Sequence, residues 1–347
     1  MPKKIKEGFG VWAYLLFVGL TFLTFAVSVS LGSVRVPLGD TIRLIWKALW
    51  RLPLPQTASS PAIILSVRLP RVLSVALTGA ALSLCGGAMQ GLLRNPLADG
   101  STLGVSSGAS LGAVIAIAFG LTMPSLPFAG TMVMAILFAF LSLLIILTLA
   151  YKLDHSLSTN TIILIGIIYS MFVSSILSFI ITYASDRVRQ ITFWTMGSLN
   201  GSSYGNALVL LLTLLVFGSV ILAHARELNA FAIGEDNAHH IGINTRRIKL
   251  TIMIAVSVLI GVSVSIGGTI GFVGLVTPHM VRMITGPNHK KLFPASLFGG
   301  AIFLMLADLL ARTLLNPTEL PLGVVTSFIG AIVFVLIFYR SRRQGHA

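Results

Sequence analysis

Charge is scarce in this chain, and its scarcity sets the class of protein. Of the 347 residues, 10% are Asp, Glu, Lys or Arg, while 55% are hydrophobic. No charged residue occurs from Gly100 to Tyr151, and none from Leu250 to Val281. Since a helix needs ~20 apolar residues to cross the hydrocarbon layer of a membrane, each charge-free stretch holds at least one span. The composition excludes an ordinary soluble domain and predicts an integral membrane protein.

The chain also lacks the motifs of most catalytic sites. Cys85 is the only cysteine, which excludes an internal disulfide and a cysteine metal cluster, so we interpret it as a packing residue. No G-x-x-x-x-G-K-[ST] phosphate loop, H-E-x-x-H motif or G-x-S-x-G motif is present. We therefore expect no catalytic residue, metal or cofactor in this chain, and a membrane enzyme has no support.

The strongest charge signal is an excess of basic residues, 24 Lys and Arg against ten Asp and Glu. These residues are scattered around apolar runs and form no compact basic region with interleaved aromatic residues, so nucleic-acid binding is not predicted. Basic residues beside membrane spans are instead typical of cytoplasmic loops. The net charge of +14 thus reports on membrane topology.

Ten apolar segments predict an all-α membrane protein with about ten transmembrane helices and one membrane domain over residues 11–340. The first segment is long for a signal-peptide core, so we predict a retained helix. With the N-terminus inside, 15 of the 24 basic residues fall on the cytoplasmic side, as the positive-inside rule requires. We therefore predict cytoplasmic tails at 1–10 and 341–347. The segments lie near 11–31, 66–91, 102–120, 126–150, 160–183, 206–225, 249–266, 270–286, 293–314 and 320–339.

A polar stretch after the sixth span, residues 227–245, predicts a short helix with both ends marked. Gly234 suits the N-cap, Glu235 and Asp236 suit the first turn, where the helix dipole favours anions, and Gly242 suits a left-handed C-terminal stop.

What this short helix packs against is open to two interpretations. Ala238 and Ile241 are three residues apart and are expected to share a face. A helix of two turns is marginal alone, so it either packs on the protein's own surface or docks in a groove of a soluble partner. His239 and His240 are adjacent and point apart on a helix, so we do not predict a metal site there.

Two glycine-rich stretches favour tight helix packing. After the turn predicted at Asn95-Pro96, Gly104, Gly108 and Gly112 allow close approach between helices. The second stretch covers residues 267–282, where four glycines make the backbone pliable and Pro278 is predicted to start a helix. We interpret His279 and Arg282 in this stretch as structural.

Asp308 is the only acidic residue well inside an apolar span. Arg312 follows four residues later, so a neutralising pair along the helix is predicted. A proton-coupled secondary transporter would instead need an unpaired carboxylate near the middle of the membrane. The predicted pair argues against that alternative.

Eight ordered stretches together resemble the permease family of type II ABC importers, which take up ferric siderophores, haem or cobalamin. The resemblance extends from about residue 60 to residue 335. The stretches begin at Arg68 and Arg71 and continue with GAALSLCGGAMQGLLRNPLAD, LGVSSGA, VRQITFWTMGSL, IGEDNAHHIG, GFVGLVTPHMVR, ADLLAR and ELPLG.

The resemblance implies partners that the chain itself lacks. In this family two permeases, identical or homologous, surround a central pathway in the bacterial cell membrane. A cytoplasmic ATPase dimer binds ATP and Mg²⁺, and an extracellular or periplasmic binding protein delivers the substrate. A ferric siderophore is the first expectation for the substrate, while cobalamin and haem remain open.

The resemblance also implies roles for three sets of residues. The loop at about 227–248 is expected to couple to the ATPase, through Gly234, Glu235, Asp236, Ala238, Ile241 and Gly242. The binding protein is expected to present glutamates to Arg68, Arg71 and Arg312. A cytoplasmic gate is expected at Asn95, Pro96 and Leu97.

Overall fold

The computed structural model describes residues 10–32, 34, 36–53, 60–121, 129–155 and 157–344, and across them the backbone forms helices and no strand. The all-α prediction is confirmed, and each of the ten predicted segments contains a helix. These helices are α1 (Val11–Ser30), α4 (Leu69–Leu92), α5 (Val105–Phe119), α6 (Ala129–Leu153), α7 (Thr159–Tyr183), the pair α9 (Tyr204–Thr213) and α10 (Ser219–Ala223), α13 (Thr245–Gly267), α14 (Val273–Thr285), α15 (His289–Thr313) and α16 (Leu322–Gln344).

Seven helical stretches in the described chain are long and apolar enough to cross a membrane. Two shorter apolar helices, α5 and the first part of α16, add to them, and α14 has 13 residues. The remaining helices are short: α2 (Leu38–Leu49), α3 (Ser60–Ala62), α8 (Val188–Thr195), α11 (Ala225–Phe231) and α12 (Glu235–His240). The predicted tails fall mainly on residues 1–9 and 345–347, which lie outside the described residues.

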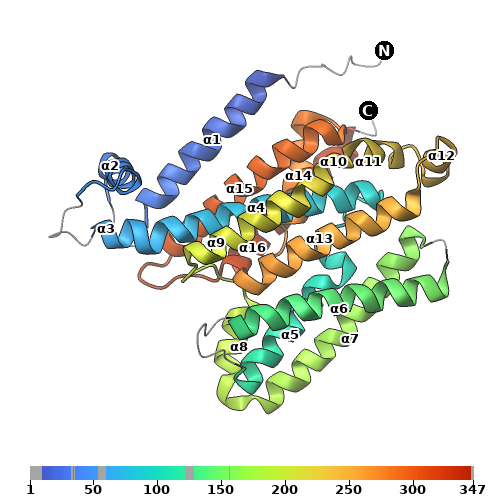
Figure 1. Cartoon of the computed structure of the whole chain (residues 1–347), viewed down its shortest axis with the longest axis horizontal. Coiled ribbons are helices and arrows are strands. Elements are labelled where there is room, and N and C mark those ends of the chain that lie inside the picture. Colours follow the sequence, from blue (N-terminus) through green and yellow to red (C-terminus); the bar gives the residue numbers. More distant parts are fainter. Residues whose placement is uncertain are drawn as a thin grey trace.

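The spans give the molecule two distinct ends (Figure 1). Helix α2 lies at one end, beside the C-terminal end of α1, and is seen nearly along its axis, so it lies across the spans. Helices α11 and α12 lie at the opposite end, where α1 begins. We call these the α2 end and the α12 end.

Helix α4 lies at the centre of one group of helices, and glycines let its neighbours touch its backbone. A Cβ atom on Gly79 would lie 2.3 Å from the carbonyl oxygen of Gly300 in α15, and one on Gly86 would lie 1.7 Å from that of Gly274 in α14. No side chain fits at such distances. Helices α4, α14 and α15 therefore pack backbone to backbone and form one unit.

A second group contains α5, α6, α7 and α8, drawn in green tones in Figure 1. A Cβ atom on Gly112 of α5 would lie 2.2 Å from the carbonyl oxygen of Met134 in α6, and one on Gly108 would lie 1.7 Å from Ser142 Oγ. The close approach predicted for this glycine stretch is confirmed. Helix α13 belongs to the first group and faces α5 and α6.

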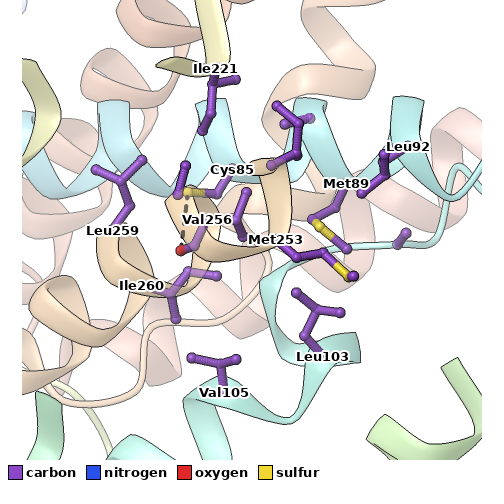
Figure 2. Close-up of a cluster of buried hydrophobic side chains, with 14 of the residues drawn as sticks. Cys85, Met89, Leu92, Leu103, Val105, Ile221, Met253, Val256, Leu259 and Ile260 are labelled. Carbon is purple, nitrogen blue, oxygen red and sulfur yellow. Dashed lines mark hydrogen bonds between the residues drawn. The ribbon is translucent and has the colours of Figure 1, made fainter. Parts of the chain in front are cut away.

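A buried apolar cluster joins α4 to α13 and to the start of α5 (Figure 2). Cys85 is buried within it, and its thiol donates to the carbonyl oxygen of Val256 over 3.8 Å. The cysteine is thus a packing residue within one chain, as its isolation in the sequence predicts.

The prediction that Pro278 starts a helix is wrong, because α14 begins at Val273 and contains Pro278 in its interior. A proline has no N–H for the carbonyl four residues earlier. Here that carbonyl belongs to Gly274, and the side chain of Gln90 donates to it over 3.5 Å and to the carbonyl of Leu275 over 3.0 Å. A buried amide from α4 therefore replaces the bond that the proline removes, which sequence spacing cannot reveal.

Candidate functional site

The predicted short helix forms at the α12 end with the expected caps. Gly234 is the N-cap residue of α12, with φ of 123°, and Gly242 has φ of 89°. The N–H of Gly242 donates to the carbonyl of His239 over 2.9 Å, and the N–H of Ile243 to that of Ala238 over 3.1 Å. This pair of bonds is the Schellman arrangement that ends a helix. The capped helix predicted from the sequence is confirmed.

The expectation that Ala238 and Ile241 share a face is wrong. Ala238 is fully buried in the chain, whereas Ile241 is 65% exposed. Helical spacing does not apply to this pair, because α12 ends at His240 and Ile241 already departs from the helix. Two large apolar residues that flank α12, Ile233 and Ile241, are exposed, and Asp236 is exposed between them.

A buried lysine that the sequence does not single out holds α12 in place. Lys249 of α13 has no exposed side-chain surface, and its Nζ lies 2.5 Å from Glu235 Oε1. The same amine donates to the carbonyl of Leu157, in the connection between α6 and α7, over 2.9 Å. Its neighbours Arg246 and Arg247 are exposed. Lys249 therefore joins three elements at one point, although its sequence context resembles that of a surface residue.

A second joint links the α11–α12 module to α15. Asn229 Oδ1 accepts from the backbone N–H of His289 over 2.8 Å and lies 2.7 Å from its Nδ1. Asn229 Nδ2 donates to Asn288 Oδ1 over 2.9 Å, and Asn288 caps α15. His289 is buried beside Gly91, where a Cβ atom would lie 2.4 Å from the imidazole Nε2. Because Gly91 near the end of α4 has no side chain, the His289 ring fits beside it and can bind Asn229 of α11.

The three predicted docking arginines lie together at the α2 end. Arg71 donates from Nε and Nη2 to Asp308 Oδ1 over 3.0 and 2.9 Å, and its Nη1 lies 2.9 Å from Glu319 Oε2. Arg312 Nε lies 3.3 Å from Asp308 Oδ2, which confirms the predicted pair along the helix. Asp308 is therefore shared by two arginines, and Glu319 adds a second carboxylate.

Arg68 and Arg312 also bind the last turn of α1. Arg68 donates to the carbonyl oxygens of Val29 and Ser30 over 3.2 and 2.7 Å and to that of Val34, and Arg312 donates to the carbonyl of Ser28. Arg68, Arg71 and Arg312 are 6%, 6% and 3% exposed. In this conformation the three guanidinium groups bind carboxylates and carbonyl oxygens of the same chain. A carboxylate from another protein would have to displace one of these partners to bind them. Glu319, with 31% of its side chain exposed, is the accessible member of the network.

The predicted gate forms a compact turn between α4 and α5. The N–H of Leu97 donates to Asn95 Oδ1 over 2.9 Å, and the N–H of Ala98 donates to the Asn95 carbonyl over 3.0 Å. Ala98 is buried, while Leu97 is 51% exposed. Pro96, between Asn95 and Leu97, is also exposed. The turn therefore places the Leu97 side chain where it lines a cavity.

That cavity has a volume of about 490 Å³ and lies between the two helix groups. Residues from α4, α5, α7, α13, α14 and α16 line it, together with the turn that carries Leu97. Its polar side chains are mostly hydroxyls, and Asp99 is its one carboxylate among the described lining residues. The glycine-rich connection after α13 also borders it, so the pliable backbone predicted there lies at the cavity wall.

Comparisons with known proteins agree with this arrangement. The FecCD transport family matches residues 20–340. An uncharacterized ABC transporter permease, YvrB of Bacillus subtilis, is 40% identical over 95% of this chain and 94% of its own length. The cobalamin import permease BtuC of Halobacterium salinarum is 36% identical over 92% and 83%, and the hemin transport permease HmuU of Yersinia pestis is 38% identical over 93% and 95%.

A solved structure, described as an inward-facing conformation of an ABC transporter classed as metal-chelate type, is also similar. It superimposes with a TM-score of 0.82 at 30% identity, covering 95% of this chain and 99% of that one. The architecture is therefore that of a type II ABC importer permease. With a match spanning residues 20–340 and a relative that is 40% identical, this chain belongs to the FecCD transport family of ABC importer permeases.

Proposed function

We propose that this chain is the membrane-spanning permease of an ATP-driven importer that moves an iron(III)-siderophore complex into the cytoplasm by alternating access. The cavity of about 490 Å³, bordered by Leu97 and lined by aliphatic side chains interspersed with hydroxyls and glycines, is the observation that supports it. A water-tolerant wall of this kind suits a bulky polar chelate better than a tight ligand cage does. Family membership supports the coarser function, import of a siderophore, haem or cobalamin.

In this proposal the α12 end faces the cytoplasm, and both termini lie on that side of a bacterial cell membrane. A cytoplasmic ATPase dimer binds ATP and Mg²⁺ and docks on α12 and its flanks, since this chain has no phosphate loop of its own. Ile233 and Ile241 offer the apolar contacts, and Gly234, Glu235, Asp236, Ala238 and Gly242 shape the module. Helix-in-groove docking uses such apolar anchors.

At the α2 end the binding protein docks over the network of Arg68, Arg71 and Arg312. Because Arg71 already contacts Glu319, a glutamate from the binding protein would compete with Glu319 for it. Such charge pairing steers the encounter and fixes orientation more than it adds affinity. A second permease, the same chain or a homologue, completes the pathway, and lipid covers the remaining apolar surface.

Cobalamin or haem import is the second candidate function. The cobalamin and hemin permeases cover almost the whole of this chain at 36% and 38% identity, which favours neither substrate over the other. Both candidates use the same architecture and the same partners.

Uptake of radiolabelled iron distinguishes the candidates. Cells lacking this gene and complemented cells would be compared across hydroxamate, catecholate and carboxylate chelators. Loss of uptake for one chelator class, restored by complementation, is the expected result. Unchanged uptake of every iron chelate, with loss of cobalamin or haem uptake, would contradict the siderophore proposal and support the second candidate.

A further inference from the structure

We propose that α2 lies in the membrane surface at the α2 end and binds anionic phospholipid headgroups through its basic residues. This inference goes beyond the proposed transport function and does not depend on the substrate. It assigns a lipid site to a helix that neither lines the cavity nor belongs to the arginine network. The position of α2, the arrangement of its side chains and its charge each point to this site.

The first observation is the position of α2. Helix α1 has 20 residues, and at 1.5 Å per residue it spans about 30 Å, the thickness of the hydrocarbon layer. The C-terminal end of α1 therefore marks one boundary of that layer. Helix α2 begins at Leu38 after a short connection, packs against α1 and lies across the spans (Figure 1). It is thus placed where the hydrocarbon layer meets the headgroups.

The second observation is that the side chains of α2 form three separate faces. One face is buried: it carries Thr41 and Leu44, and Leu44 belongs to the same apolar cluster as Val29 of α1. At about 100° per residue, the other two faces are each turned about 120° from it. One of these carries Arg43 and Lys47. The other is apolar and consists of Leu38, Ile42, Trp46 and Leu49, which are 44%, 54%, 58% and 73% exposed. A helix that rests sideways on a membrane protein needs this arrangement, with its apolar face towards the lipid tails and its basic face away from them.

The third observation is a pair of exposed tryptophans. The ring centroids of Trp46 and Trp50 lie 5.7 Å apart, and the two residues are 58% and 61% exposed. Tryptophan is enriched where a membrane meets water, because its ring is apolar and its N–H is polar. Near the start of α1, at the α12 end, Trp12 is 84% exposed. Exposed tryptophans therefore lie at both ends of this span, as in the two aromatic belts of membrane proteins.

The fourth observation is positive charge without an acidic partner. Arg43, Lys47 and Arg51 lie on α2 or directly after it, and Asp40 in the first turn is the one acidic residue of this helix. Within the described part of the chain, no carboxylate forms an ion pair with these three basic residues. They are also exceptions to the predicted topology, which places 15 of the 24 basic residues on the cytoplasmic side. The phosphate groups of anionic lipids complement such a basic cluster at a membrane surface.

Together these features favour lipid over a protein partner. An amphipathic helix with Trp and Leu on one face and Lys or Arg on another binds membrane surfaces, with its apolar face buried about 5–10 Å into the boundary. The neighbouring helix α1 is a candidate span that is mostly outside the buried core, and its Phe22 and Leu23 are 71% and 58% exposed. Lipid that covers α1 therefore also borders α2. A second protein that covers α2 is the alternative, and the experiments distinguish the two.

Fluorescence quenching in bilayers tests the depth of α2. The full chain would carry Trp12→Phe and Trp194→Phe, which leave Trp46 and Trp50 as the remaining two of its four tryptophans. The quenchers are phospholipids brominated either close to the headgroup or near the ends of the acyl chains. We expect the shallow quencher to act roughly twofold more strongly than the deep one, because the helix lies at the boundary. Stronger quenching by the deep lipid, or none by either, would overturn the proposal, and the second outcome would show that protein covers α2. If the two Phe substitutions lower thermal stability, the difference in quenching between the native chain and its Trp46→Phe/Trp50→Phe variant measures the same quantity.

Competition between lipids tests the headgroup. Brominated phosphatidylglycerol, which is anionic, or brominated phosphatidylcholine would compete with unbrominated phosphatidylcholine for the surroundings of Trp46. We expect phosphatidylglycerol to be favoured roughly fivefold at low salt, and the preference to weaken as salt screens the charges. Arg43→Gln/Lys47→Gln should bring the ratio near one, whereas Arg246→Gln/Arg247→Gln, exposed near α12, should leave it unchanged. Equal quenching by both lipids in the native chain, or a preference that survives Arg43→Gln/Lys47→Gln, would overturn the proposal. Neither measurement involves transport, so such a result would leave the proposed import function standing.

Discussion

The two ends of α15 are fixed by different chemistry. At the α2 end, Asp308 and Arg312 of this helix join a buried ionic network with Arg71 and Glu319. At the α12 end, His289 is held by neutral hydrogen bonds to Asn229. A buried ionic network loses much stability when one member is removed, because charges are left without partners. Neutral hydrogen bonds contribute less each and can be exchanged at lower cost. The α2 end is therefore the more rigid anchor, and the α12 end is the more adjustable joint.

Removing the shared carboxylate should produce the largest effect. Asp308→Ala leaves Arg71 and Arg312 buried with only Glu319 as an acid nearby, so we expect a loss of about 3–5 kcal/mol in stability. Thermal denaturation in detergent, followed by size-exclusion chromatography, would measure it. Glu319→Gln is the matched control at a partly exposed position, where we expect about 1 kcal/mol or less. Equal losses of stability in the two variants would contradict the view that the α2 end is the more rigid anchor, because they would show that burial of Asp308 does not determine its contribution.

Removing the Lys249 contacts should cause the next largest loss of stability. Lys249→Met keeps most of the unbranched side chain but leaves the Leu157 carbonyl and the Glu235 carboxylate without their donor, at a cost of about 1–3 kcal/mol. Arg247→Met on the same helix is exposed and should change stability by less than about 0.5 kcal/mol. We also expect substrate uptake to fall for Lys249→Met at normal expression. Wild-type stability and uptake would show that this lysine does not position α12.

Removing the Asn229 contacts should lower stability less than removing those of Asp308 or Lys249. Asn229→Ala removes the side chain that contacts His289 and Asn288, and we expect a loss of about 1–2 kcal/mol. Asn237→Ala, an exposed residue bonded only to the nearby Ile233 carbonyl, is the control. Thermal denaturation in detergent would compare the stability of the two variants. A loss as large as that of Asp308→Ala would contradict the view that this joint is adjustable.

The smallest effect on stability is expected on the exposed flank of α12. Ile241→Glu should change stability by less than about 0.5 kcal/mol, since the side chain is 65% exposed. If this flank docks on the ATPase, the variant should abolish stimulation of ATP hydrolysis by the loaded binding protein. Ala238→Glu is the contrasting variant, because it buries a charge and should destabilise the fold itself. Normal stimulation with Ile241→Glu would place the docking surface elsewhere.

Features with local causes could be predicted from the sequence. All ten apolar segments contain a helix, because length and hydropathy decide that outcome in a membrane. The caps of α12 at Gly234 and Gly242 were also predictable, since glycine tolerates the positive φ values found there. The Asp308–Arg312 pair follows from helical spacing alone.

Features that depend on other helices could not be predicted in the same way. Lys249, Asn229 and Glu319 occupy ordinary sequence contexts, and their roles arise from contacts with residues on other elements, 14 positions away for Glu235 and 59 or more for the others. The exposure of Ile241 depends on where α12 ends, and a donor from Gln90 compensates for the hydrogen bond that Pro278 removes inside α14. Arg68, Arg71 and Arg312 were expected to meet glutamates of a binding protein, and the sequence could not show that partners within the chain bury them here.

The backbone contacts between Gly79 and Gly300 and between Gly86 and Gly274 limit how this protein can move. Because no side chain lies between these helices, α4, α14 and α15 cannot slide past one another without a backbone clash. The contacts at Gly108 and Gly112 restrain α5 and α6 equally. We therefore expect the two groups to move as units, with one displaced relative to the other along α13. The Asn95–Leu97 turn is one of the links between the groups, so such a displacement would change the width of the cavity and the position of Leu97 together.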